Sequence, residues 1–167
     1  KRVNGYLDFA KAALNVPMAH LMVGKYSVID EANRRQILLR PYQIHAITKV
    51  REASRKNNSG YVWHTTGSGK SFTMVFLSKA LILHEALKQC RIMVVTDRVD
   101  LEDQLSKTFA SGGELAGRKD KQNAMATSGK RLAEQIGKGT ERIIFSLIQK
   151  FNSATKLPEC VNKSPDI

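Results

Sequence analysis

The chain has 167 residues, of which 42% are hydrophobic, enough for one domain of ordinary size with a buried core. Lysine and arginine number 27 against 15 aspartate and glutamate, and the formal net charge of +12 favours polyanionic partners, nucleic acid before nucleotides. The longest apolar run, residues 72–83, is interrupted by Ser78 and Lys79 and is too short to span a bilayer, which excludes a membrane protein. Cys90 and Cys160 lie outside any C-x-x-C spacing, so we expect no disulfide framework, no cysteine zinc site and a location in the reducing cytoplasm.

The positive charge is distributed unevenly along the chain. The formal net charge is +7 over residues 1–60, +1 over residues 61–110 and +4 over residues 111–167. The middle segment is also the most apolar, so we expect it to form the core, with basic surface contributed by the two flanks. For the flanks, an ordinary solvated surface is the alternative to contact with a polyanion.

The first part of the chain predicts short helices and then one longer helix. Residues 1–39 mix helical patterns with breakers at Gly5, Pro17 and Gly24, and we interpret them as a lead-in segment without a recognisable site. Pro41 suits the first turn of a helix, and the apolar residues after it recur at helical spacing as far as an Asn-Asn-Ser-Gly run.

The rest of the chain alternates between strand and helix patterns. Continuous apolar strands joined by crossover helices predict an α/β fold, with a parallel sheet and helices on both of its faces. The Gly-, Ala-, Lys- and Asn-rich residues 111–128 predict an exposed, mobile connection. We expect strands at residues 61–64, 91–96 and 142–145, and helices at about residues 71–87, 101–109 and 130–136.

A glycine-rich loop lies between the first of these strands and the helix after it. Gly67 and Gly69 permit backbone conformations that other residues resist, so successive N–H groups can turn toward phosphate oxygens at the positive end of the next helix. Lys70 has the reach to contact the β- and γ-phosphates, and the Ser71 hydroxyl is placed to ligate Mg²⁺. The alternative is a Gly/Ser-rich helix-capping turn with an incidental lysine, but the strand–loop–helix context favours a phosphate loop.

The loop departs from the strict G-x-x-x-x-G-K-[ST] pattern, because His64 stands where the pattern has glycine. The phosphate-binding chemistry does not depend on that position. We therefore predict that ATP and Mg²⁺ bind through Thr66, Gly67, Ser68, Gly69, Lys70 and Ser71, with Lys70 as the catalytic residue and Ser71 as the metal ligand.

Three blocks together resemble the first motor domain of superfamily 2 helicases. They are Arg40-Pro41-Tyr42-Gln43, the run from Gly60 to Ser71, and the run from Val94 through Gln104. The Gly60 to Ser71 run is similar to the motor subunit of type I restriction enzymes, in which histidine also stands in place of glycine. The resemblance covers about residues 40–151 and implies a RecA-like P-loop NTPase fold.

The resemblance also implies roles for individual residues. Gln43 matches the glutamine that reads the adenine edge, a task suited to a side-chain amide, although a polar residue at an exposed helix start is the alternative. Arg98 follows a predicted strand on the side that faces DNA in the family, while pairing with Asp97 or Glu102 is the competing interpretation. Ser146 occupies a position whose hydroxyl and backbone touch DNA in the family, and an ordinary cap explains a serine there equally well.

Other parts of such a subunit are not found in this sequence. No Asp-Glu pair follows the predicted third strand, and no [Asp/Glu]-x-Lys signature of a nuclease occurs. We therefore expect residues 40–167 to be the N-terminal part of motor domain 1, truncated before its acidic motif, and residues 1–39 to link it to a preceding nuclease domain. Such a piece would bind ATP better than it hydrolyses it.

The resemblance implies an ATP-dependent DNA translocase belonging to a type I site-specific deoxyribonuclease. Its implied partners are double-stranded DNA and the methylation and specificity subunits of the restriction-modification complex. Three alternatives remain: another superfamily 2 helicase or a type III restriction subunit; a P-loop kinase, which would account for neither Gln43 nor the basic flanks; and a DNA-binding module with a vestigial nucleotide site.

Overall fold

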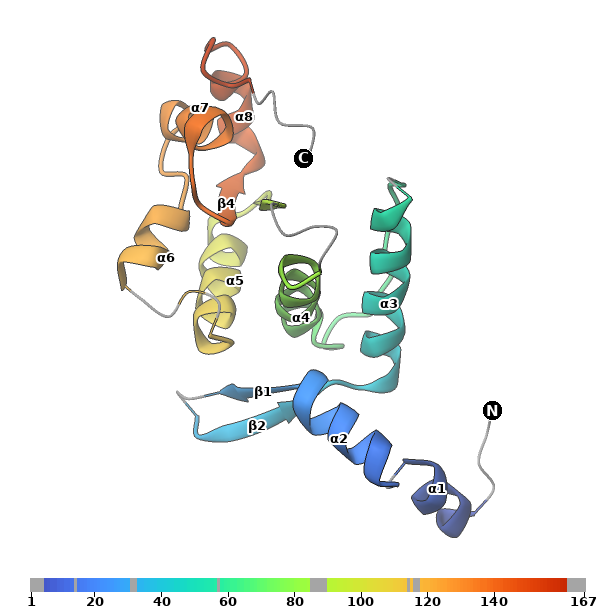
Figure 1. Ribbon diagram of the computed structural model, residues 1–167. Coiled ribbons are helices and arrows are strands. Elements are labelled where there is room, and N and C mark those ends of the chain that lie inside the picture. Colours follow the sequence, from blue (N-terminus) through green and yellow to red (C-terminus); the bar gives the residue numbers. More distant parts are fainter. Residues whose placement is uncertain are drawn as a thin grey trace.

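The computed structural model is a mixed α/β arrangement drawn out along one direction, with the first helix, α1, and the last helix, α8, far apart (Figure 1). Among the residues described, no helix is both long and apolar enough to cross a bilayer. The structure describes residues 5–13, 15–30, 33–56, 58–84, 90–113, 115 and 118–161.

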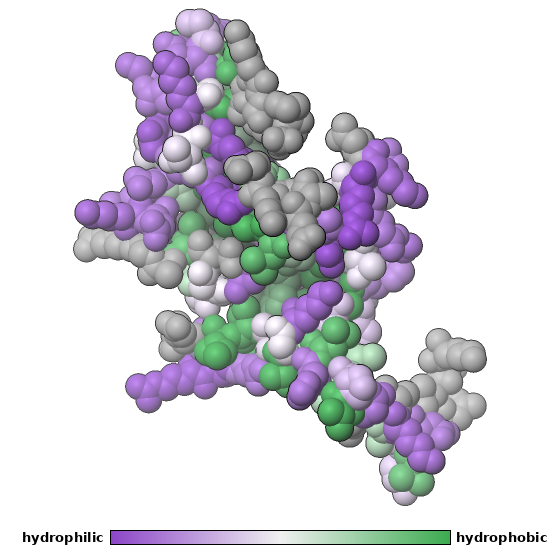
Figure 2. Space-filling model, in the orientation of Figure 1, coloured by the Kyte–Doolittle hydropathy of each residue, from purple (hydrophilic) through white to green (hydrophobic). Residues whose placement is uncertain are grey.

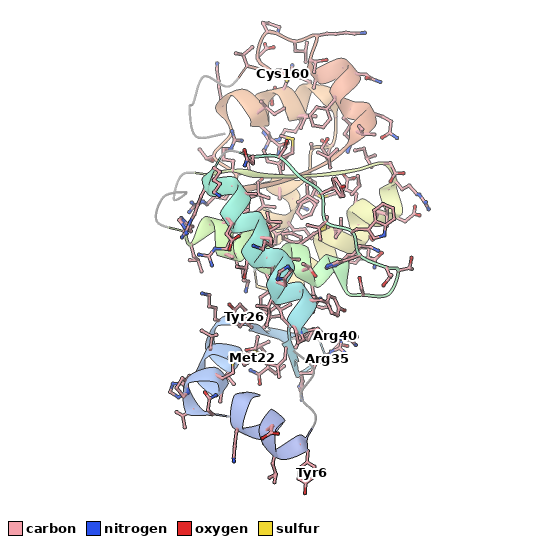
Figure 3. The ribbon with its side chains drawn as sticks, turned by 90° about the vertical axis from the view of Figure 1, so that its right-hand side faces the viewer. Tyr6, Met22, Tyr26, Arg35, Arg40 and Cys160 are labelled. Carbon is pink, nitrogen blue, oxygen red and sulfur yellow. The ribbon has the colours of Figure 1, made fainter. Side chains whose placement is uncertain are left out.

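The lead-in segment contains two short helices, as its sequence predicts, and also a β-hairpin, which its sequence did not predict. The hairpin strands pair antiparallel, with Val28 opposite Ile37. Its turn is closed by the buried Asp30, which accepts hydrogen bonds from Asn33 and Arg35; these bonds lower the pKa of its carboxyl group. Figure 3 shows this part extending away from the main body. The elements are α1 (Tyr6–Ala13), α2 (Val16–Lys25), β1 (Ser27–Asp30) and β2 (Arg35–Leu38).

Two helices flank the glycine-rich loop. Helix α3 (Pro41–Arg55) begins with proline in its first turn, as predicted, and its start is fixed by Gln43, whose side-chain oxygen accepts a hydrogen bond from the Arg40 N–H. Figure 3 places Arg40 where the chain passes from the hairpin into α3. Helix α4 (Lys70–Ile82) begins directly after the loop. The hairpin packs under both helices, because Val28 and Leu39 form one apolar cluster with residues of α3 and α4.

The predicted parallel pairing is confirmed for the second and third expected strands. Strand β3 (Ile92–Thr96) pairs in parallel with β4 (Ile143–Leu147), so their carboxyl ends lie at the same edge. Helices cover both faces: Phe145 packs in a cluster with residues of α4 and α5, and Ile144 packs on the opposite side with residues of α7 and α8. The remaining helices are α5 (Val99–Ser111), α6 (Arg118–Ala124), α7 (Gly129–Lys138) and α8 (Ile148–Ala154).

The strand predicted at residues 61–64 is not present as a strand. No other strand of the described chain lies beside this segment, and without a partner its backbone groups have no ladder to join. Its aromatic side chains face solvent, Tyr61 being 91% exposed and Trp63 88% exposed. The predicted end of the following helix at residue 87 also differs, because α4 ends at Ile82 and residues 85–89 lie outside those described.

The expected exposed connection at residues 111–128 is also corrected. It contains α6, and it buries three apolar side chains. The Ala126 N–H donates a hydrogen bond of 2.9 Å to the Phe145 carbonyl, which fixes the end of this segment to β4. Composition did not reveal this packing, since small and polar residues give little hydrophobic signal. The buried residues are Leu115, Ala124 and Ala126.

Phe109 of α5 provides a test of this packing. It is fully buried and meets the Phe145 ring edge-on, with ring centroids 5.2 Å apart. We expect Phe109→Ala to lower the free energy of unfolding by about 3–5 kcal/mol, because it removes this contact and leaves a cavity. Urea denaturation followed by circular dichroism would measure the change. Leu101→Ala, on the exposed side of the same helix, should change stability by only about 0.5 kcal/mol, and equal losses would contradict the assignment.

Candidate nucleotide-binding site

The glycine-rich loop has the backbone shape that its sequence predicts. Gly67 and Gly69 both have left-handed φ angles, 76° and 78°, which a residue with a side chain rarely adopts. The Ser68 N–H donates to the Thr65 carbonyl at 3.3 Å and closes a turn within the loop. Thr66 lies exposed at the tip of the loop. The loop therefore presents its backbone to solvent at the N-terminus of α4, where the helix dipole favours an anion.

Lys70 folds back over the loop from the first position of α4. Its ammonium group donates hydrogen bonds to the carbonyl oxygens of His64, at 3.3 Å, and Thr65, at 3.0 Å. The cation thus lies against the first residues of the loop, and its contact with phosphate stays a prediction. Ser71 follows in the first turn of the helix and is half-buried. Among the described residues, no group of three or more His, Cys, Asp or Glu side chains could hold a metal ion, and Mg²⁺ ligation by Ser71 stays a prediction.

Gln43 lies at the base of the loop and is only 5% exposed. Its side-chain nitrogen donates to the Gly69 carbonyl and to the Thr73 hydroxyl, both at 3.1 Å. A Cβ atom at Gly69 would lie 3.0 Å from that nitrogen, so this close approach also favours glycine. Both ends of the amide are thus used within the protein, and adenine recognition by Gln43 stays a prediction.

Tyr42 also contacts the loop, and the sequence reasoning did not assign it a role. Its hydroxyl donates to the Ser68 carbonyl at 2.7 Å. Its ring meets the His64 ring edge-on, with centroids 5.4 Å apart and planes at 87°. The only indication of this contact in the sequence is the position of Tyr42 next to Gln43, in the Arg-Pro-Tyr-Gln block that precedes the loop.

A cavity of about 440 Å³ opens beside the loop. Its volume is in the range of small-molecule sites. The Ser68 hydroxyl oxygen is buried and has no hydrogen-bond partner within the protein. The positive-φ glycines, the lysine and this unpaired hydroxyl fit a nucleotide polyphosphate. The lining residues are Arg40, Tyr42, Trp63, His64, Thr65, Thr66, Gly67 and Ser68.

The two residues predicted to contact DNA lie at neighbouring strand ends but differ in exposure. Arg98 precedes α5 and is exposed, and its Nε lies 3.9 Å from the Asp97 carboxylate, so the Asp97 pairing is the one formed. Ser146 is fully buried, and its hydroxyl donates to the Leu147 carbonyl at 3.2 Å. The side chain does not reach the surface in this arrangement, and contact between Ser146 and DNA stays a prediction.

Two contacts that the sequence did not indicate join these strand ends. The Gln149 amide donates to the Asp97 carbonyl at 3.0 Å. Lys150 lies 3.5 Å from the carboxylate of the buried Glu102, so this carboxylate pairs with Lys150, and Arg98 pairs with Asp97. A hydrogen bond and an ion pair made by side chains of α8 therefore connect the ends of the two strands.

Comparison with known proteins agrees with the loop geometry. The sequence model of the SWI2/SNF2 ATPase family matches residues 42–167. An endonuclease subunit of a type I restriction enzyme from Staphylococcus saprophyticus is 30% identical over 154 residues, covering 92% of this chain and 16% of the relative. A subunit of the same description from Haemophilus influenzae is 41% identical over 92 residues, covering 55% of this chain and 8% of the relative.

A third such subunit, from Staphylococcus aureus strain COL, is 34% identical over 109 residues, covering 65% of this chain and 12% of the relative. The chain thus spans less than a fifth of the length of each of these three relatives. The family match covers most of the chain, including the loop, Lys70 and the parallel sheet. The chain therefore belongs to the SWI2/SNF2 ATPase family and is homologous to the endonuclease subunits of type I restriction enzymes.

Proposed function

We propose that this chain is part of the first RecA-like motor domain of the DNA-translocating subunit of a type I restriction enzyme. The observation that carries the proposal is the loop at residues 65–69, with its left-handed glycines and with Lys70 folded across it. The relatives named as endonuclease subunits support the restriction system over the kinase alternative. In the whole protein, ATP hydrolysis would drive movement along double-stranded DNA before endonucleolytic cleavage.

The loop residues would hold Mg·ATP by complementary charge. Lys70 would exchange its bonds to backbone carbonyls for bonds to the β- and γ-phosphates, while the N–H groups of the loop donate to phosphate oxygens. Ser71 would ligate Mg²⁺, which neutralises phosphate charge when it is bound. The Gln43 amide bonds the Gly69 carbonyl, which keeps α3 fixed to the last residue of the loop.

The DNA-binding part of the proposal rests on the positive charge of the chain and on the exposed Arg98 beside the carboxyl ends of the strands. The two flanks of the chain carry formal net charges of +7 and +4, and Arg98 is exposed at the carboxyl edge of the sheet. Contacts of this kind bind the phosphate backbone and read no base sequence. Choice of site would then belong to a specificity subunit, acting with a methylation subunit in the same complex.

Removing the loop lysine tests the nucleotide site. We expect Lys70→Ala in the full-length protein to weaken Mg·ATP binding by about ten- to a hundredfold, because it deletes a charge-assisted contact with phosphate. Isothermal titration calorimetry would measure the affinity. Lys56→Ala, at the exposed end of α3, removes the same charge away from the loop and should leave the affinity unchanged. Unchanged affinity for Lys70→Ala in a folded protein would refute the site.

Salt dependence tests the DNA contact. We expect affinity for duplex DNA to fall steeply with salt and to vary little with base sequence, because phosphate contacts release counterions. Arg98→Ala should weaken binding to different duplexes equally and reduce the slope of log affinity against log salt by about 0.9. Fluorescence anisotropy would measure both. Lys107→Ala is the matched control on α5, because Lys107 pairs with Asp103 at 2.6 Å, and it should leave the salt slope unchanged. If Arg98→Ala also left the salt slope unchanged, contact between Arg98 and DNA would be excluded.

A further inference from the structure

Helix α3 holds two consecutive carbonyl groups of the glycine-rich loop. The Tyr42 hydroxyl donates to the Ser68 carbonyl at 2.7 Å, and the Gln43 amide donates to the Gly69 carbonyl at 3.1 Å. These two carbonyls belong to the last two peptide units before α4 begins. Neighbouring side chains of one helix therefore fix the orientation of both units.

Fixing a carbonyl also fixes the N–H of the same peptide unit. In a trans peptide the carbonyl and the N–H point in opposite directions. Because the Ser68 and Gly69 carbonyls point toward α3, the N–H groups of Gly69 and Lys70 point away from it. Two successive N–H groups directed to the same side form an anion-binding concavity at the start of a helix.

We propose that Tyr42 is a positioning residue that sets the direction of the Gly69 N–H toward the bound polyphosphate. This inference rests on the proposed function. Gly69 has a left-handed φ of 78° and no side chain to restrain its backbone. The Ser68–Gly69 peptide unit, which carries the Gly69 N–H, therefore needs a contact from another part of the chain to fix its orientation. The buried Gln43 amide donates to the Gly69 carbonyl of the next unit at 3.1 Å and only at 3.4 Å to the Ser68 carbonyl of this unit, so the 2.7 Å hydroxyl contact of Tyr42 is the shorter of the two bonds that hold it.

The proposal also gives His64 a role. The His64 ring meets the Tyr42 ring edge-on at 5.4 Å and so restricts the tyrosine that holds the far end of the loop. Tyr42 thereby contacts both the residue that precedes the loop and the residue near its end. Glycine, which the strict pattern has at this position, would provide no ring for this contact.

Tyr42→Phe in the full-length protein tests the proposal, because it removes the hydroxyl and keeps the ring. We expect the dissociation constant for Mg·ADP, measured by calorimetry, to rise about three- to tenfold, the size expected from one lost hydrogen bond. In steady-state ATP hydrolysis, KM should rise while kcat is retained, since the contact serves ground-state binding. Tyr61→Phe is the matched control, the same change at a tyrosine that is 91% exposed.

The histidine supplies a second test with a conservative rescue. His64→Ala should raise KM for ATP, and His64→Phe, which keeps an aromatic edge, should return KM to near the wild-type value. A purely structural role would lower the active fraction and hence kcat with KM unchanged, and that outcome overturns the proposal. Equal ADP affinities for Tyr42→Phe and Tyr61→Phe also overturn it. Failure of the wild-type protein to bind Mg·ADP would instead refute the proposed function.

Discussion

The burial of β4 on both faces is the constraint on which the rest of the structure depends. Its successive side chains enter different clusters, Phe145 toward α4 and α5 and Ile144 toward α7 and α8. A strand with both faces covered cannot move by one residue without placing every side chain in the wrong layer. The parallel pairing with β3 is held in this register, and α4 is fixed to the sheet through Val75, which packs in the same cluster as Phe145.

Much of this arrangement could be predicted from local patterns. The runs Ile92–Val95 and Ile143–Phe145 are apolar without interruption, and residues 101–109 and 130–136 have helical patterns, so the parallel strand pair and the helices α5 and α7 were predicted correctly. The run at residues 61–64 has the same β-favouring composition but forms no ladder, because pairing depends on a second strand rather than on propensity. The segment around Ala126 was missed for the opposite reason: its burial comes from contacts with β4, which composition does not record.

In the candidate site, too, some features could be predicted from the sequence and others could not. The loop could be predicted because glycine and lysine at fixed spacing have direct conformational and electrostatic consequences. Tyr42 and Gln43 reach the loop across about 26 residues of sequence, and such contacts are visible only in three dimensions. At Ser146 the prediction named a side chain that is buried and whose hydroxyl donates to the carbonyl of the next residue, Leu147. The local sequence therefore predicts the conformation of the loop, whereas the contacts of Tyr42 and Gln43 with it depend on the tertiary fold.

The bonds between Lys70 and the carbonyls of His64 and Thr65 have a consequence for selectivity. In the proposed function, a ligand that bonds Lys70 would replace the two carbonyl groups that already accept hydrogen bonds from its ammonium group. A neutral or weakly charged molecule gains little from that exchange, whereas a polyphosphate replaces each dipole with a full negative charge. In the proposed function, the Lys70 contacts would therefore favour ligands of high charge density over neutral ones, whatever the base.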